Sequence, residues 1–160
     1  MRPGRRRPDL AVGPGERLLA WATAEGGAVV GGTRDALYLP DRVPWEQVEA
    51  AGWDSEASTL RVREVGTWGA PRVEHALVLD EPRRLLQLVH ERVTASVVLQ
   101  RHVPVDGRRG VRVIARRAPG RRDEPTWVYE FDEGVDPADP DVRRKAAEAM
   151  AAVREELGVT

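Results

Sequence analysis

Seven arginines between residues 108 and 122 are the side chains most able to do chemistry in this chain. They are Arg108, Arg109, Arg112, Arg116, Arg117, Arg121 and Arg122. A stripe of such cations could hold the phosphates of nucleic acid or of acidic lipid. Residues 110–117 alternate as a strand does, so Arg112 and Arg116 share the outer face if Val111 and Val113 face the core.

The competing interpretation is a solvated hairpin that is paired in part with the acidic segment 130–141. Residues 101–122 carry a net charge of +7 and residues 123–160 carry −7, so the two blocks could neutralise each other. Lys145 is the single lysine among 25 basic residues, a bias that GC-rich codon usage also explains. Aromatic side chains that could stack on bases occur beside the cluster only at Trp127 and Tyr129.

Other residue types with reactive side chains do not form a recognisable site. The three histidines, His75, His90 and His102, lie far apart in sequence, and cysteine is absent, so we predict no metal site. The glycines at positions 26, 27, 31 and 32 do not have the spacing of a nucleotide-binding loop, and they fit a hairpin turn.

Acidic residues cluster at positions 132, 133, 136, 139 and 141 and could bind a cation. Prolines at positions 137 and 140, and the missing glycine of a calcium loop, favour loop and helix-cap roles instead. The serines lack the surroundings of a catalytic nucleophile. We therefore predict no catalytic residue, no metal and no cofactor, and we expect the chain not to be an enzyme.

The elements that position these residues begin with a series of short strands closed by one helix. The predicted strands span 17–23, 27–32, 36–40, 43–54, 59–65 and 73–79. The helix begins at Pro82 and carries apolar residues at helical spacing, namely Leu85, Leu86, Val89, Val93 and Val97. It ends between Thr94 and Leu99, and Pro104 sets its outer limit. This order predicts a curled antiparallel sheet or small barrel capped by a helix.

Four tryptophans, Trp21, Trp45, Trp53 and Trp68, lie in this first region. We interpret them as packing residues of the core and its rim, because tryptophan supplies a large buried area to a small sheet. The alternative is an exposed aromatic patch for a partner.

A hairpin and a second helix follow. The predicted strands span 110–117 and 126–131, and Asp139 and Pro140 begin a helix that Gly158 ends. The apolar stripe of this helix consists of Ala146, Ala149, Met150, Val153 and Leu157. The organisation that we predict is α+β: a flexible tail at 1–14, the helix-capped sheet at 15–100, and a hairpin with a C-terminal helix at 101–160 packed on that sheet.

The segments Leu37-Tyr38-Leu39 and Arg42-Val43-Pro44-Trp45-Glu46-Gln47-Val48 resemble those of bacterial pleckstrin-homology-like (PH-like) domains. With Gly32-Thr33-Arg34-Asp35-Ala36 they also resemble a family of actinobacterial proteins. The resemblance covers roughly residues 15–100 and implies a PH-like fold, but no activity. The basic pocket of lipid-binding members is not carried over, because the first hairpin turn here is Glu25-Gly26-Gly27.

These observations favour a cytoplasmic binding or scaffold module that recognises an unknown protein partner. The absence of cysteine suits a reducing cytoplasm, and no apolar run approaches the length of a membrane span. Our alternative is polyanion binding, to nucleic acid or anionic lipid, through the Arg-rich hairpin 108–122.

Overall fold

The computed structural model describes residues 8–66, 72–156 and 158. Part of the predicted tail lies outside these residues, as do Trp68 and Leu157. The chain divides into two compact units. Unit 1 runs to Val65 and includes Arg72–Ser96 and Ala118–Gly120, whereas the other described residues from Val97 onward belong to unit 2. This division falls where a helix ends and a strand begins, whereas the sequence placed the boundary after residue 100.

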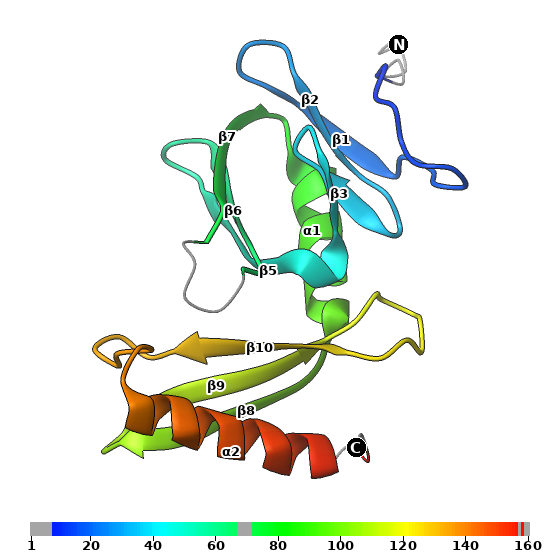
Figure 1. The fold of residues 1–160 in the computed structure, drawn as a ribbon. Helices are drawn as coiled ribbons and strands as arrows, with labels where there is room; N and C mark the ends of the chain where they lie inside the picture. The colour runs from blue at the N-terminus through cyan, green and yellow to red at the C-terminus, as the bar shows by residue number, and fades with distance from the viewer. Residues whose placement is uncertain (1–7, 67–71, 157, 159–160) are drawn as a thin grey trace. The chain divides into compact units, whose positions relative to one another are not determined.

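Unit 1 contains a seven-stranded antiparallel sheet and one α-helix (Figure 1). Its elements are β1 (Ala20–Ala24), β2 (Val29–Gly32), β3 (Ala36–Tyr38), β4 (Arg42–Pro44), the 3-10 helix η1 (Trp45–Gln47), β5 (Val48–Asp54), β6 (Thr59–Glu64), β7 (Glu74–Asp80) and α1 (Arg83–Ser96). The strand order is β4-β3-β2-β1-β7-β6-β5. β1 joins the two halves, because it pairs with β2 on one side and with β7 on the other.

The sheet of unit 1 is open. Among the described strands, β4 and β5 are the two edges and do not pair with each other. The prediction of an antiparallel sheet followed by a helix is confirmed, and of its two alternatives, a curled sheet or a small barrel, the barrel is excluded because the sheet is not closed. β4 is short, and Pro44 has no backbone N–H. It can therefore form few backbone hydrogen bonds with a strand that would close the sheet.

The predicted strand at 43–54 is two strands, interrupted by η1. The cause is Trp45, whose side chain is fully buried and whose indole Nε1 donates to the Thr33 carbonyl oxygen at 2.9 Å. Burial of this ring together with its N–H turns the chain at this point. Trp45 is therefore a core residue, as predicted, and Trp53 packs at the edge of the same core.

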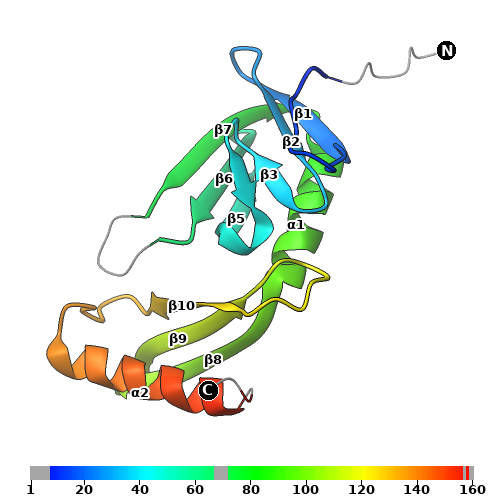
Figure 2. The ribbon, with the colours of Figure 1, turned by 45° about the vertical axis from the view of Figure 1, so that its right-hand side comes forward.

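The core of unit 1 lies between the sheet and α1. Leu37, Leu60 and Leu85 are among its fully buried side chains, and α1 lies against β1, β2, β5 and η1 (Figure 2). Leu85 and Val89 are buried as predicted, whereas Val97 lies beyond the helix. Burying one face of α1 in this way is the main source of its stability.

Unit 2 contains a three-stranded antiparallel sheet and one helix. Its elements are β8 (Val97–Asp106), β9 (Arg109–Arg116), β10 (Thr126–Phe131) and α2 (Pro140–Glu156). β9 and β10 form the predicted antiparallel pair, from Thr126 opposite Arg116 to Phe131 opposite Val111. β8 was not predicted as a strand. Its proline, Pro104, is accommodated because β8 is an edge strand.

Helix α2 begins at Pro140 as predicted, and the Asp139 side chain accepts a hydrogen bond from the Asp141 N–H at 2.8 Å. Its buried residues Ala146, Ala149 and Val153 pack on valines of β8 and β9, including Val105, Val111 and Val113. Val111 and Val113 thus face α2. The predicted packing of this second part of the chain on the first stays a prediction.

Candidate functional site

The seven arginines of the predicted polyanion site are distributed along the whole of β9. Arg108 lies in the turn before this strand, and Arg117, Arg121 and Arg122 follow it. A strand of eight residues spans about 23 Å from its first residue to its last. The exposed cations Arg108 and Arg109 therefore lie at one end of β9, and Arg121 and Arg122 follow its other end.

Arg112, within β9, and Arg116, its last residue, are less accessible than the exposed arginines at the two ends of the strand. Arg112 and Arg116 share the strand face opposite α2, as the alternation predicted. Arg112 is half-buried and lies 3.8 Å from the Glu130 carboxylate, whereas Arg116 is only 4% exposed. The Arg112–Glu130 pair joins the basic hairpin to the acidic segment, as the interpretation of a neutralised hairpin requires.

The acidic residues that follow β10 accept hydrogen bonds within turns and caps. Asp132 accepts hydrogen bonds from the Gly110 N–H at 2.8 Å and from His102 at 2.7 Å. These two hydrogen bonds lower the pKa of Asp132 from its ordinary value, and the bond from His102 has the larger effect. Asp136 accepts from the Ala138 N–H in the same way. Within the described residues, no three His, Asp or Glu side chains come together as a group that could hold a metal ion.

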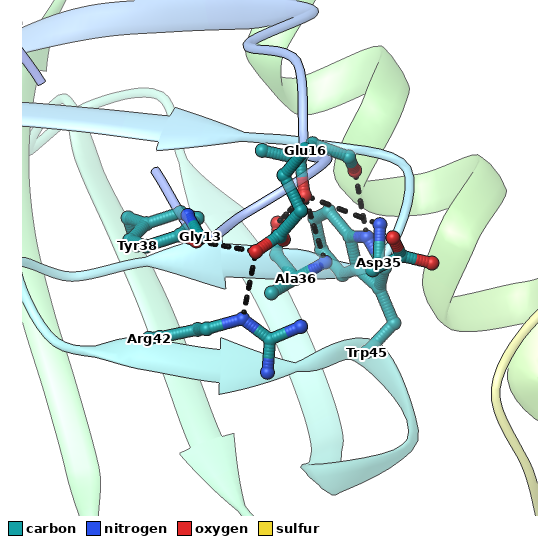
Figure 3. A network of polar contacts seen from close by, with 8 residues as sticks. Gly13, Glu16, Asp35, Ala36, Tyr38, Arg42 and Trp45 are labelled. Carbon is teal, nitrogen blue, oxygen red and sulfur yellow. Dashed lines mark hydrogen bonds and ion pairs between the residues drawn. The ribbon is translucent and has the colours of Figure 1, made fainter. Parts of the chain in front are cut away.

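One densely connected polar cluster was not revealed by the sequence (Figure 3). The Glu16 carboxylate accepts hydrogen bonds from the Thr33 hydroxyl at 2.7 Å, the Tyr38 hydroxyl at 2.8 Å and the Arg42 Nε at 3.1 Å. The Tyr38 oxygen in turn accepts from the Gly13 N–H at 2.8 Å. The cluster therefore ties the segment before β1 to β3 and β4.

Burial and hydrogen bonding act in opposite directions on the ionisation of Glu16, whose side chain is 6% exposed. Burial alone would raise the pKa of this carboxyl, but hydrogen bonds from Thr33, Arg42 and Tyr38 outweigh it and lower the pKa. Burial raises the pKa of Tyr38, and the hydrogen bond to Glu16 raises the pKa of Arg42. All of these groups are satisfied by one another, so we interpret the cluster as a structural clasp.

A more promising site lies between β5 and α1. An open hollow of about 220 Å³ is lined by Ala51, Gly52, Trp53, Leu60, Leu86, Val89, His90, Val93 and Thr94. We call it the apolar hollow, because the only polar side-chain groups among these residues are those of His90 and Thr94 and the indole N–H of Trp53. It is smaller than the pockets that enclose drug-sized ligands, and its size suits a single apolar side chain.

The strand that borders the apolar hollow is an edge strand with little protection. β5 has seven residues, and Ala50, Ala51 and Gly52 at its centre are small and uncharged. Proteins usually protect such edges with charges, prolines or short strands. The other edge of this sheet, β4, has all three: it is three residues long and contains Arg42 and Pro44.

The sequence contained a partial signal for this site, because Trp53 was among the tryptophans that could form a partner-binding patch. It gave none for the α1 side of the hollow, because that requires knowing how the helix packs. In the part of the chain that the structure describes, no helix is long and apolar enough to cross a membrane. Comparisons with models of protein families, with curated proteins and with solved structures find no match to this chain.

Proposed function

We propose that this chain is a cytoplasmic, non-enzymatic binding module with a PH-like fold, which recognises a protein partner through the edge of β5. The observation that carries the proposal is the coincidence of a weakly protected edge strand with the apolar hollow beside it. An edge strand offers backbone hydrogen bonds to an extended segment, and a pocket beside it gives that segment specificity.

The strand order supports the PH-like part of the proposal. Two consecutive antiparallel meanders, β1–β4 and β5–β7, meet through the β1–β7 pair, and α1 follows the last strand directly. This order of strands followed by a helix supports the proposal, although the sheet is not closed into a barrel. The residues that carry the resemblance have packing roles, since Leu37 and Trp45 are fully buried.

The small side chains of β5 favour an extended segment as the partner. A strand added to this edge lies about 4.8 Å from β5, and Ala50, Ala51 and Gly52 leave its backbone free to approach. Alternate side chains of the added strand then point to opposite faces of the sheet. Those on the α1 side reach the apolar hollow, where burial of an aliphatic side chain contributes about 1.5–3 kcal/mol.

Two neighbouring substitutions on α1 test this surface. Thr94 and Ala95 are both exposed, but only Thr94 lines the apolar hollow. We expect peptides selected on the full-length protein from a random displayed library to lose at least tenfold in affinity on Thr94→Arg, because the long charged side chain fills the hollow. Ala95→Arg, the matched control, is expected to change affinity less than twofold in the same fluorescence titration.

The backbone contribution is tested on the peptide. In an added strand, only every second backbone N–H donates to β5. We therefore compare two peptides, one N-methylated at the odd-numbered amides and one at the even-numbered amides, and expect one of them to lose binding. Selection of no peptide at all, or equal losses on Thr94→Arg and Ala95→Arg, would contradict binding at the β5 edge.

Polyanion binding through hairpin 108–122 is the second candidate. Its support is the exposure of Arg108, Arg109, Arg121 and Arg122. Binding to RNA, DNA or anionic vesicles would weaken steeply with added salt, because each neutralised phosphate releases counterions. The double substitution Arg108→Glu with Arg109→Glu is expected to reduce such binding and its salt dependence. Absence of binding to all three at low salt would end this candidate.

A further inference from the structure

The face of β5 that points away from the apolar hollow borders a second hollow, of about 540 Å³. Six of its nine lining residues form two rows across the sheet, given by the strand register. One row is Ala50, Arg63 and Glu74, and the other is Gly52, Arg61 and Ala76. Residues directly opposite each other in neighbouring strands share a face. We call this region the basic hollow, because its rows contain two arginines and one glutamate.

The charges of the two rows are balanced differently. Arg63 lies opposite Glu74 and its Nε is 3.7 Å from the buried Glu49 carboxylate, so it already has acidic neighbours. Arg61 is exposed and lies between Gly52 and Ala76. It forms no hydrogen bond or ion pair with any residue that the structure describes. Arg61 therefore has no acidic residue directly opposite it on either neighbouring strand, and Glu74 lies diagonally, opposite Arg63.

Gly52 leaves a path from Arg61 to the edge of the sheet. A Cβ atom placed on Gly52 would meet no other atom within 4 Å. A strand added to β5 would lie about 9.6 Å from β6, which is twice the spacing of neighbouring strands. The extended side chains of an arginine on β6 and a glutamate on the added strand can together span that distance, because no side chain of β5 intervenes.

We propose that the partner segment alternates apolar and acidic residues, with Arg61 as the residue that selects the acidic ones. The apolar residues occupy the apolar hollow, and the acidic residues face the basic hollow over Gly52. This inference rests on the proposed strand addition to β5. It adds the chemistry of the partner: an extended acidic-apolar segment rather than any extended segment.

The experiment compares three peptides of about seven residues, the length of β5, in which valine alternates with glutamate, serine or lysine. Titrations monitor the fluorescence of a dye on each peptide with the full-length protein. We expect the glutamate peptide to bind about tenfold more tightly than the lysine peptide, with the serine peptide between them. Added salt is expected to reduce the difference in affinity between the glutamate and lysine peptides, because the contact with Arg61 is exposed to solvent.

Three variants connect that preference to Arg61. Arg61→Glu is expected to make the lysine peptide bind more tightly than the glutamate peptide, and to change the affinity of the serine peptide by less than about twofold. Gly52→Val is expected to remove the preference, because its side chain separates Arg61 from the edge. Arg84→Glu makes the same charge change on an exposed part of α1 that lines neither hollow, and is expected to preserve the order.

The outcomes separate this inference from the proposed function. If all three peptides bind with equal affinity and all lose affinity on Thr94→Arg, the proposed strand addition to β5 stands and the preference for acidic residues is overturned. An equal effect of Arg61→Glu and Arg84→Glu would overturn the role of Arg61, because it would reflect net charge alone. Failure of all three peptides to bind, while peptides selected from the random library do bind, would overturn the acidic-apolar pattern and keep strand addition. Failure of the library selection as well would overturn both proposals.

Discussion

At the scale of single residues, Glu16 connects three other side chains. Its buried carboxylate accepts three side-chain hydrogen bonds, one of them charged. Glu16→Gln replaces an acceptor oxygen by an amide that can only donate, so either Thr33 or the Tyr38–Arg42 pair loses its acceptor. We expect a loss of about 1–3 kcal/mol in the free energy of unfolding. Urea denaturation of this variant is compared with Glu25→Gln, an exposed control expected within 0.5 kcal/mol of wild type.

The same carboxylate makes stability depend on pH in acid. Because its pKa is lowered in the folded state, Glu16 contributes stability fully above its ordinary pKa of 4.5. This contribution is lost as the pH falls through the lower folded-state value. We expect wild type to lose more stability than Glu16→Gln in urea titrations between about pH 5 and pH 3. Asp132, whose pKa is also lowered, is present in both proteins, so the stability of the variant still depends on pH to some extent. Parallel curves for the two proteins would contradict this role.

The sequence could not reveal this cluster, because its members are distant from one another and none belongs to a motif. Glu16 is 17 residues from Thr33, 22 from Tyr38 and 26 from Arg42. They meet only because β3 pairs with β4 and the segment before β1 contacts both. In contrast, Trp45 was identified as a packing residue from its type alone, since a large ring in a small sheet is usually buried.

At the scale of elements, the β8–β9 pair depends on Gly110. A Cβ atom on this residue would lie 2.7 Å from the Val103 carbonyl carbon and 2.8 Å from the Pro104 Cα. Both neighbours are backbone atoms of β8, so they cannot turn aside as a side chain does. We expect Gly110→Ala to destabilise unit 2 by at least the roughly 1–3 kcal/mol typical of overpacking.

Gly52→Ala is the matched control for that substitution, since Gly52 is also in a strand but has open space at its Cβ. Hydrogen exchange of the β9 amides measures the local effect: faster exchange is expected in Gly110→Ala and unchanged exchange in Gly52→Ala. Equal exchange in both variants would show that β8 can move away from β9 at little cost.

Local signals located most elements, and their failures have identifiable physical causes. Alternation predicted β6 and β9, and proline in the first turn predicted where α1 and α2 begin. β8 was missed because its apolar start, from Val97 to Leu99, continues the helical spacing of α1, and Pro104 indicated a break. Only the pairing with β9 decides for a strand. The interruption at η1 was missed because it depends on where the Trp45 side chain is buried.

At the scale of the whole molecule, each unit has hydrophobic clusters of its own. The main cluster contains residues from Ala20 to Val93, and the two smaller clusters contain residues from Leu99 to Val153. The candidate site also lies within one unit, because both hollows are lined only by residues of unit 1. Sequence patterns describe one element at a time. They cannot show that the edge of β5 and one side of α1 enclose a hollow, since this depends on the packing of the two elements.

This separation predicts that residues 1–96 fold without the rest of the chain. The fragment contains all seven strands of the larger sheet, α1 and every member of the main cluster. We expect cooperative urea unfolding monitored by tryptophan fluorescence, and binding of the peptides selected on the full-length protein. Leu85→Ala in the fragment is expected to cost about 2–5 kcal/mol, because Leu85 is fully buried beneath the sheet. A fragment that unfolds without cooperativity, or that is indifferent to Leu85→Ala, would show that the core of unit 1 requires residues beyond Ser96.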